Sequence, residues 1–252
     1  MSKDVNHLGQ PMGFAVPGWN ERQRPPRTAM KGRFCSVLPL EPERHAADLY
    51  AANSEDKEGR MWTYLAYGPF SSFESYLAKM NESWLKKDWH IHAIIDERGG
   101  LATGLASYMR IEPETGSIEV SAVMYSPRLQ RTAAGTEAMY LMMRRAFDEL
   151  SYRRYEWRCN AFNEASVNAA KRLGFQFEGV LRQERVVKGR NRDTAWFSII
   201  DREWPQIKAA FETWLGPDNF GSKGRQRQSL TQLREAAIRY LHRHASRASG
   251  CG

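Results

Sequence analysis

The sequence predicts an α/β (α+β) domain built on one mixed, mostly antiparallel sheet that helices flank. Two observations support this fold class. Between His90 and Tyr125, three strand-like runs follow one another with only short turns between them, which is typical of an antiparallel meander. Between Thr132 and Asp201, helical and strand-like segments alternate, and such crossovers allow parallel strands. The predicted order is β, α, α, β, β, β, α, β, α, β, β, α, which makes a seven-stranded sheet.

The first half of the chain is expected to supply four strands and two helices. Arg33 to Leu40 predicts a strand, and Glu41 to Ala52 predicts a helix. Ser72 to Trp89 predicts a second helix, because its apolar residues recur at helical spacing. Glu-Arg-Gly-Gly and Pro-Glu-Thr-Gly turns separate the meander strands, which run from His90 to Asp96, Leu101 to Ile111 and Ser117 to Tyr125.

The second half is expected to alternate helices with strands. Thr132 to Leu150 predicts a long helix with a wide apolar face. Gly174 is suited to the left-handed residue that follows a helix, so it should end the helix before it. The remaining predicted segments are a strand from Tyr155 to Asn160, a helix from Ala165 to Leu173, strands from Phe175 to Val187 and Thr194 to Asp201, and a helix from Trp204 to Leu215.

Composition divides the chain into three parts. Residues 1–32 are rich in proline and glycine and predict an extended arm before the domain at 33–220. Residues 221–252 hold seven basic residues and one acidic residue, which account for +6 of the net charge of +8. The tail is expected to be partly helical, from Ser229 to His244, and to be either a solvated appendage or a segment that binds an anionic partner such as RNA.

Composition also excludes several classes of protein. The chain has 252 residues, 42% of them hydrophobic, so it can bury a core without disulfides. It has no apolar run of about 18 residues and no secretory signal, so we expect a cytoplasmic protein that does not span a membrane. Three widely spaced cysteines indicate neither a disulfide framework nor a zinc site. His90 and His92 share a strand face without a third ligand, so no metal is expected.

The segment from Tyr125 to Ala138 joins a predicted strand to the long helix. Small residues, Ala133, Ala134 and Gly135, stand at the start of that helix. The free N–H groups and the dipole of a helix N-terminus bind anions, and small side chains let a pyrophosphate approach them. Arg131 and Thr132 add a positive charge and a hydroxyl.

The same segment resembles the GNAT superfamily of N-acetyltransferases. Gln130-x-x-Ala133-x-Gly135 follows the motif of Gln or Arg, two residues, Gly, one residue, and Gly or Ala, with alanine in place of the first glycine. A second block is similar to the branch of ribosomal-protein N-terminal alanine acetyltransferases. It consists of Asn163-Glu-Ala-Ser166, Ala169-Ala-Lys-Arg-Leu-Gly-Phe175 and Phe177-Glu-Gly-Val-Leu-Arg182. The resemblance covers about Gly32 to Asp201.

This resemblance implies that acetyl-CoA binds in a V-shaped split between the fourth and fifth strands, Ser117 to Tyr125 and Tyr155 to Asn160. The pantetheine arm would pair with the backbone of Ala122, Val123 and Met124. The residues implied for the pyrophosphate are Gln130, Arg131, Thr132, Ala133, Ala134, Gly135 and Thr136. The implied activity is direct acetyl transfer to a primary amine of a small molecule or a peptide N-terminus, by a monomer or homodimer.

The resemblance also suggests catalytic residues, each with a second interpretation. Ser166 matches a proton donor of the branch, or is a serine in the first turn of a helix. Asn163 caps that helix or hydrogen-bonds the pantetheine. Glu119 is the preferred general base, or only pairs on the sheet. Further candidates for the base are Glu178, Glu184 and Asp193.

Other hypotheses remain open at this stage. The protein is an acetyl-CoA-binding protein of the same fold without turnover, or a ribosome- or RNA-associated module that uses its basic tail. Trp62-Thr-Tyr64 and Tyr67-Gly-Pro69 either pack in the core or line the groove for the acceptor amine. Cys159, within an apolar strand, is expected to be a packing residue.

Overall fold

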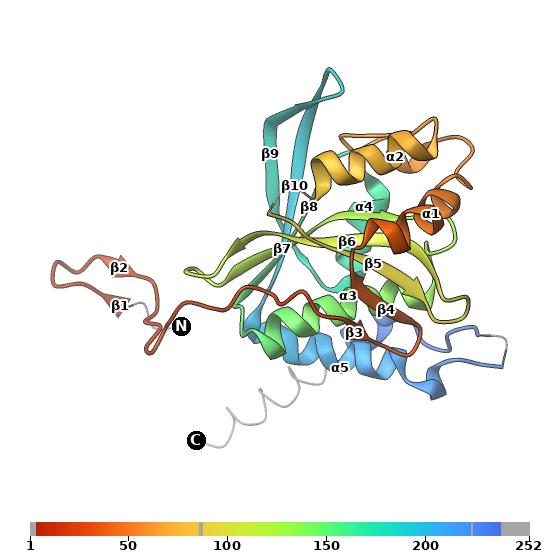
Figure 1. The fold of residues 1–252 in the computed structure, drawn as a ribbon. Coiled ribbons are helices and arrows are strands. Elements are labelled where there is room, and N and C mark those ends of the chain that lie inside the picture. The colour runs from red at the N-terminus through yellow and green to blue at the C-terminus, as the bar shows by residue number, and fades with distance from the viewer. Residues whose placement is uncertain (1–3, 86–87, 223, 238–252) are drawn as a thin grey trace.

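A computed structural model describes residues 4–85, 88–222 and 224–237. Its centre is an eight-stranded sheet in the order β3-β4-β5-β6-β7-β8-β10-β9 (Figure 1). The strands are β3 (Met30–Lys31), β4 (Cys35–Pro39), β5 (His90–Asp96), β6 (Leu101–Glu112), β7 (Ser117–Tyr125), β8 (Arg154–Asn160), β9 (Gln176–Val187) and β10 (Arg190–Ile200). Among the strands of the described residues, only β7 and β8 pair in parallel. The predicted mixed, mostly antiparallel fold is confirmed.

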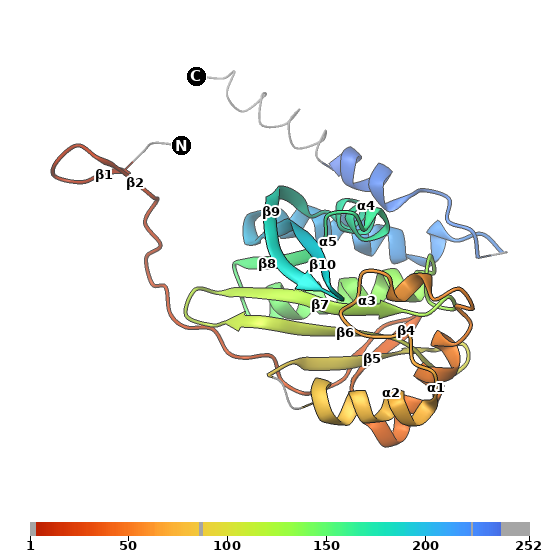
Figure 2. The same ribbon diagram turned by 90° about the horizontal axis from the view of Figure 1, so that it is seen from above.

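The sheet differs from the prediction at its edge. All seven predicted strands are present, and β3 is an additional short strand at the end of the predicted arm. Met30 in β3 is 2% exposed and belongs to the core, so the arm is anchored before the domain begins. Further out, β1 (Asp4–Val5) and β2 (Pro11–Met12) form a small hairpin that stands away from the sheet in Figures 1 and 2.

Five α-helices of the described residues before Phe220 flank the sheet. They are α1 (Pro42–Asn53), α2 (Phe73–Lys79), α3 (Ala133–Arg144), α4 (Glu164–Leu173) and α5 (Trp204–Leu215). The second and third are shorter than predicted, because each continues as one wider π-helical turn, at Met80–Trp84 and Arg145–Glu149. Trp84 in the first of these turns is buried against the rings of Tyr67 and Tyr76.

The two faces of the sheet carry two separate cores. The larger core packs α3, α4 and α5 on one face, and the smaller core packs α1 and α2 on the other (Figure 2). Successive residues of a strand point to opposite faces. Accordingly, Ile118 and Val120 of β7 belong to the larger core, while Glu119 between them faces the other side.

The sheet splits between β7 and β8. The two strands pair from Ser117 and Arg154 to Val120 and Trp157, and residues 121–125 have no partner in β8. A bulge lies where the pairing stops: the register of β7 on β6 shifts there, and Ala122 has a positive φ of 48°. A bulge bends a strand and increases its twist, which turns the end of β7 away from β8. The split predicted between the fourth and fifth strands is therefore confirmed.

The described part of the basic tail packs on the domain. A helix begins at Leu230, which is fully buried in the larger core. Nη1 of Arg234 donates hydrogen bonds to the carbonyls of Lys171 (2.7 Å) and Arg172 (3.0 Å) at the C-terminal end of α4. The part of the predicted tail helix beyond Ala237 lies outside the described residues. The packing of the domain thus extends past the proposed boundary at residue 220.

Candidate functional site

The first turn of α3 offers free backbone donors. Thr132 is its N-cap, and the Oγ1 of this residue accepts a hydrogen bond from the Gly135 amide (3.1 Å). Among the described residues, the N–H groups of Ala133 and Ala134 have no acceptor, as expected for the first residues of a helix. Arg131, exposed and at a φ of 60°, immediately precedes the cap. The segment predicted to bind an anion therefore presents a cluster of donors, and its binding of an anion stays a prediction.

Ala133 and Gly135 have different roles in this turn. Ala133 is the first helical residue and has no positive φ, so its methyl group causes no backbone strain. A Cβ on Gly135 would lie 2.8 Å from the carbonyl oxygen of Leu129 and 2.9 Å from a ring carbon of Tyr125. The hydroxyl of Tyr125 donates to the Gly135 carbonyl (2.7 Å). The glycine is required by close packing within the protein, which the sequence motif alone did not indicate.

A second guanidinium group reaches this turn from α4. Nη1 of Arg172 donates to Oγ1 of Thr136 (3.1 Å), which in turn donates to the carbonyl of Thr132 (3.2 Å). Burial lowers the pKa of Arg172. Gln130 lies on the same loop, but its side chain donates to the Tyr125 carbonyl (2.8 Å) and so supports the loop. Sequence reasoning missed Arg172, because nothing local to α4 indicates its approach to α3.

The end of β7 presents an unpaired backbone edge toward β8. This edge includes Ala122, Val123 and Met124, the residues expected to pair with the pantetheine. Val123 packs against the larger core, and Met124 is 2% exposed in the smaller one. Side chains on both faces of the sheet thus hold this segment in place. Its free backbone edge can pair with an extended ligand, in the same way that the edge of a sheet pairs with an added strand.

Glu119, which is buried, belongs to a chain of ion pairs that ends at the surface. Its Oε2 is 2.7 Å from Nη1 of Arg110 and 3.1 Å from Nε of Arg158. The chain continues through Glu156 and Arg154 to Glu178, with distances of 2.9, 2.6 and 2.6 Å. Burial raises the pKa of Glu119, although both arginines act in the opposite direction. Glu119 is thus ion-paired on the sheet, and its role as the general base stays a prediction.

Asn163 and Ser166 lie at the start of α4, and Asn163 is its N-cap. Oδ1 of Asn163 accepts a hydrogen bond from the Ser166 amide (3.2 Å). Oγ of Ser166 accepts a hydrogen bond from Nε1 of Trp157 (3.0 Å), whose ring belongs to the larger core. Ser166 is therefore on the face that α3, α4 and α5 cover, and Glu119 is on the face that α1 and α2 cover, so the two candidates lie on opposite faces of the sheet.

The other acidic candidates serve the β9–β10 hairpin and its neighbours. Glu178 ends the chain of ion pairs, and the hydrogen bonds from Arg154 lower its pKa. Glu184 accepts a hydrogen bond from Oγ1 of Thr194 (2.5 Å). Asp193 accepts from the amide of Gln183 (2.8 Å) within the same hairpin. Each of these carboxylates already has a structural partner.

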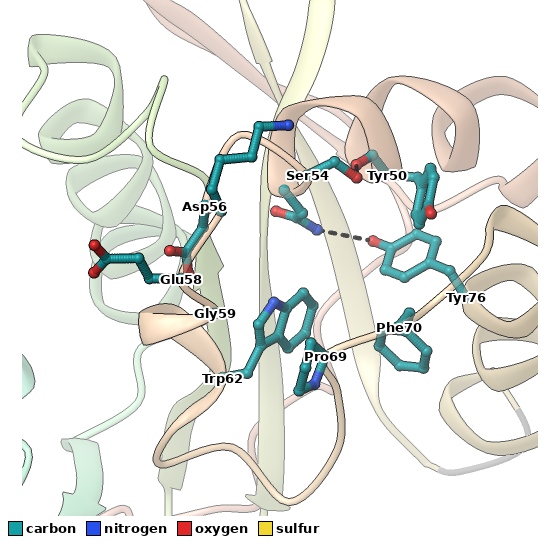
Figure 3. A pocket seen from close by; sticks show the side chains of 11 residues that line it. Tyr50, Ser54, Asp56, Glu58, Gly59, Trp62, Pro69, Phe70 and Tyr76 are labelled. Atoms are coloured by element: carbon teal, nitrogen blue, oxygen red, sulfur yellow. Dashed lines mark hydrogen bonds between the residues drawn. The ribbon is translucent and has the colours of Figure 1, made fainter.

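A pocket of about 320 Å³ opens between α1, α2 and the segment that connects them (Figure 3). Aromatic side chains form much of its wall, and Trp62 and Pro69 from the two aromatic motifs of the sequence are among its lining residues. Nζ of Lys188, at the tip of the β9–β10 hairpin, donates to the carbonyls of Trp62 (3.0 Å) and Gly68 (2.9 Å). The hairpin therefore holds the loop that forms one side of the pocket.

The pocket adjoins the end of β7. Nδ2 of Asn53, which lines the pocket, is 3.8 Å from the sulfur of Met124 and 3.4 Å from the hydroxyl of Tyr76.

Within the described ranges, no three histidine, cysteine or acidic side chains are grouped as a metal site, and no helix is long and apolar enough to cross a membrane.

Comparison with known proteins gives one consistent family. Residues 37–176 match the acetyltransferase (GNAT) domain. The crystal structure of a GCN5-related N-acetyltransferase from Brucella melitensis is 40% identical, covers 87% of this chain and all of its own, and superposes with a TM-score of 0.85. YdaF of Bacillus subtilis, whose name assigns it provisionally to the ribosomal N-acetyltransferases, is 26% identical over 70% of this chain and 97% of its own.

A more distant structure was solved with a relevant ligand. The microcin C7 self-immunity acetyltransferase MccE, in complex with acetyl-CoA and AMP, is 18% identical with a TM-score of 0.58. It covers 67% of this chain and 93% of its own, and at this identity the likeness concerns the fold alone.

Proposed function

Because the chain belongs to the GNAT family of acetyltransferases, we propose that it transfers the acetyl group of acetyl-CoA to a primary amine of a small molecule or a peptide N-terminus. The observation that carries this proposal is the split between β7 and β8, with the free donors of α3 beside the loop that follows β7. A backbone edge suits the amide-rich pantetheine arm, and a helix N-terminus suits the pyrophosphate.

The chain's own residues fit acetyl-CoA along its length. We assign the pyrophosphate to the N–H groups of Ala133 and Ala134, with Arg131 before the turn and Arg172 hydrogen-bonded to it as neighbouring cations. The pantetheine pairs with the free edge at residues 122–124. The acetyl-CoA complex of MccE supports this assignment through the shared fold. In this arrangement Thr132, Gly135 and Thr136 shape the helix start, and Gln130 supports the loop before it.

The reaction joins the amine nitrogen to the thioester carbonyl carbon and breaks the bond from that carbon to sulfur. The amine loses a proton, which we assign to Glu119 because burial raises the pKa of this carboxyl. The departing thiolate gains a proton, which we assign to the hydroxyl of Ser166 on the opposite face of the sheet. A thiol has a pKa of about 8.5, so this donor assists rather than decides the rate. Positioning of the two substrates supplies much of the acceleration.

One observation favours a second function. Glu119 is ion-paired with two arginines, so it is less free to accept a proton than an unpaired carboxylate. A protein with the same split and a fully engaged Glu119 would hold acetyl-CoA without turning it over. The two functions differ in whether an added amine causes release of coenzyme A as a free thiol, which happens only in acetyl transfer.

The test is a thiol-release assay on the full-length protein with acetyl-CoA. The acceptors are a panel of small amines together with peptides that carry ribosomal-protein N-termini, since the name of YdaF points to that class. We expect amine-dependent release of coenzyme A, and calorimetry should show that Arg131→Asp weakens coenzyme A binding about tenfold. Arg202→Asp, an exposed charge reversal in the turn before α5, is the matched control. Binding without release for every acceptor would favour the second function.

A further inference from the structure

The pocket between α1 and α2 has preformed aromatic walls. Tyr50 comes from α1, Trp62 and Phe70 from the connecting segment, and Tyr76 from α2 (Figure 3). Their rings contact one another, with centroids 5.4 Å apart for Trp62 and Phe70, 5.3 Å for Phe70 and Tyr76, and 5.7 Å for Tyr50 and Tyr76. Each ring therefore restrains its neighbours. At about 320 Å³, the pocket is at the small end of ligand sites and suits one group the size of a side chain.

Asn53 brings an unsatisfied acceptor to this pocket. The residue is 4% exposed, and its Nδ2 is directed to the hydroxyl of Tyr76 and the sulfur of Met124. Its Oδ1 is buried and has no hydrogen-bond partner among the described residues. A buried carbonyl oxygen without a donor is costly and uncommon in native proteins. A ligand with an N–H group would satisfy it.

The preference of the pocket for a cation comes from its aromatic rings, because the charges beside it balance, with Asp56 and Glu58 offset by Lys57 and Arg60. Asp56, Lys57 and Glu58 line it, two acidic and one basic. Oδ2 of Asp56 accepts a hydrogen bond from the Met61 amide (2.7 Å), and Glu58 pairs with Arg60 at an exposed position. The faces of the aromatic rings attract cations and repel anions. The pocket as a whole is therefore suited to a positively charged group.

We propose that this pocket selects the acceptor of the acetyl group as a small primary amine, bound as its ammonium ion and carrying an apolar group that fills the aromatic walls. Oδ1 of Asn53 accepts one hydrogen bond from the ammonium group. The inference rests on the proposed function, because the place of Asn53 beside Met124 connects the pocket to the split. It adds the class of the acceptor and a residue that determines specificity.

The test measures binding to the full-length protein without acetyl-CoA, so that it does not depend on acetyl transfer. The probe is 2-phenylethylamine, compared with 2-phenylethanol, which has the same ring and chain and a hydroxyl in place of the ammonium. Trp62 lines the pocket, so tryptophan fluorescence can report binding alongside calorimetry. We expect the amine to bind at least tenfold more tightly than the alcohol.

Variants at Asn53 test its role directly. Asn53→Leu should weaken binding of the amine about 10- to 100-fold, as expected for loss of a hydrogen bond to a charged group, and should leave binding of the alcohol nearly unchanged. Asn53→Asp should retain or increase amine binding. Asn20→Leu, on the exposed arm, is the matched control, and coenzyme A affinity verifies that each variant is folded.

Two outcomes would overturn the proposal. One is equal binding of the amine and the alcohol to the unmodified protein, which needs no variant to fold. The other is unchanged amine binding by a folded Asn53→Leu protein. Failure of the thiol-release assay with normal amine binding would instead reject the proposed function and leave the pocket as an amine site.

Discussion

Replacement of Gly135 by alanine tests why the first turn of α3 contains a glycine. The added Cβ would lie 2.8 Å from the backbone oxygen of Leu129 and 2.9 Å from the ring of Tyr125, closer than such contacts allow. The oxygen belongs to the backbone, so relief requires the helix start to move. Overpacking of this kind costs about 1–3 kcal/mol, and alanine returns up to about 1 kcal/mol through its higher helix propensity.

The expected net loss of stability for Gly135→Ala is about 1–2 kcal/mol, which lowers the melting temperature by about 2–8 °C in a chain of this size. The displaced turn carries the N–H groups of Ala133 and Ala134, so coenzyme A should bind about tenfold more weakly. For the same reason, Gly135→Glu should lose stability as well as coenzyme A affinity. Thermal unfolding and calorimetry on the same samples measure both effects.

Gly99→Ala is the matched control for this experiment. A Cβ on Gly99 would meet nothing within 4 Å, and its φ is not in the left-handed region, so the variant should be as stable as the unmodified protein or slightly more stable. If Gly135→Ala melts at the unmodified temperature and binds coenzyme A equally well, the packing explanation for this glycine is wrong.

Three further predictions concern the chemistry and the tail. Glu119→Gln should lower kcat about 10²–10⁴-fold, most clearly at pH values below the pKa of the amine. The variant should also lose the acid limb of the pH–rate profile. An unchanged pH–rate profile would exclude Glu119 as the base. Because burial raises the pKa of Glu119, its contribution to stability is present at low pH and lost as the pH rises through that pKa, so melting curves should show the variant gaining relative stability with pH. Ser166→Ala should lower kcat less than about tenfold. It should also cost about 1 kcal/mol of stability, since Nε1 of Trp157 loses its hydrogen-bond acceptor. A fall in kcat as large as that of Glu119→Gln would show that the proton donor decides the rate. Truncation after Asn219 should leave kcat for a small amine nearly unchanged and should lower the melting temperature, because it removes the fully buried Leu230. Leu230→Ala alone should lower the free energy of unfolding by about 2–5 kcal/mol. A normal melting curve with a large fall in kcat would place the tail in the acceptor site.

Local patterns in the sequence were sufficient for the seven long strands and for the places of the helices, whereas the place of the split came from the resemblance to the GNAT superfamily. Alternation along β7 and helical spacing along α3 involve residues a few positions apart, and so do the cap at Thr132 and the left-handed Gly174 after α4. These features follow from backbone geometry and short-range hydrogen bonds, which each segment carries with it. The motif at Gln130 to Gly135 likewise marked the strand-to-helix junction at which the split is found.

Only the tertiary structure decided what each side chain meets. It brought Arg110 and Arg158 to Glu119, Arg172 to the first turn of α3, and Leu230 of the tail into the core. These partners come from different strands and helices, so no local period could have indicated them. The place of Asn53 shows the same limit. It is the last residue of α1, one position beyond the helix that the sequence predicted. Its unpaired oxygen, its contact with Met124 and the aromatic walls beside it exist only because α1, α2 and the segment between them fold together. Long-range packing determines burial, and burial determines which polar groups are left without a partner.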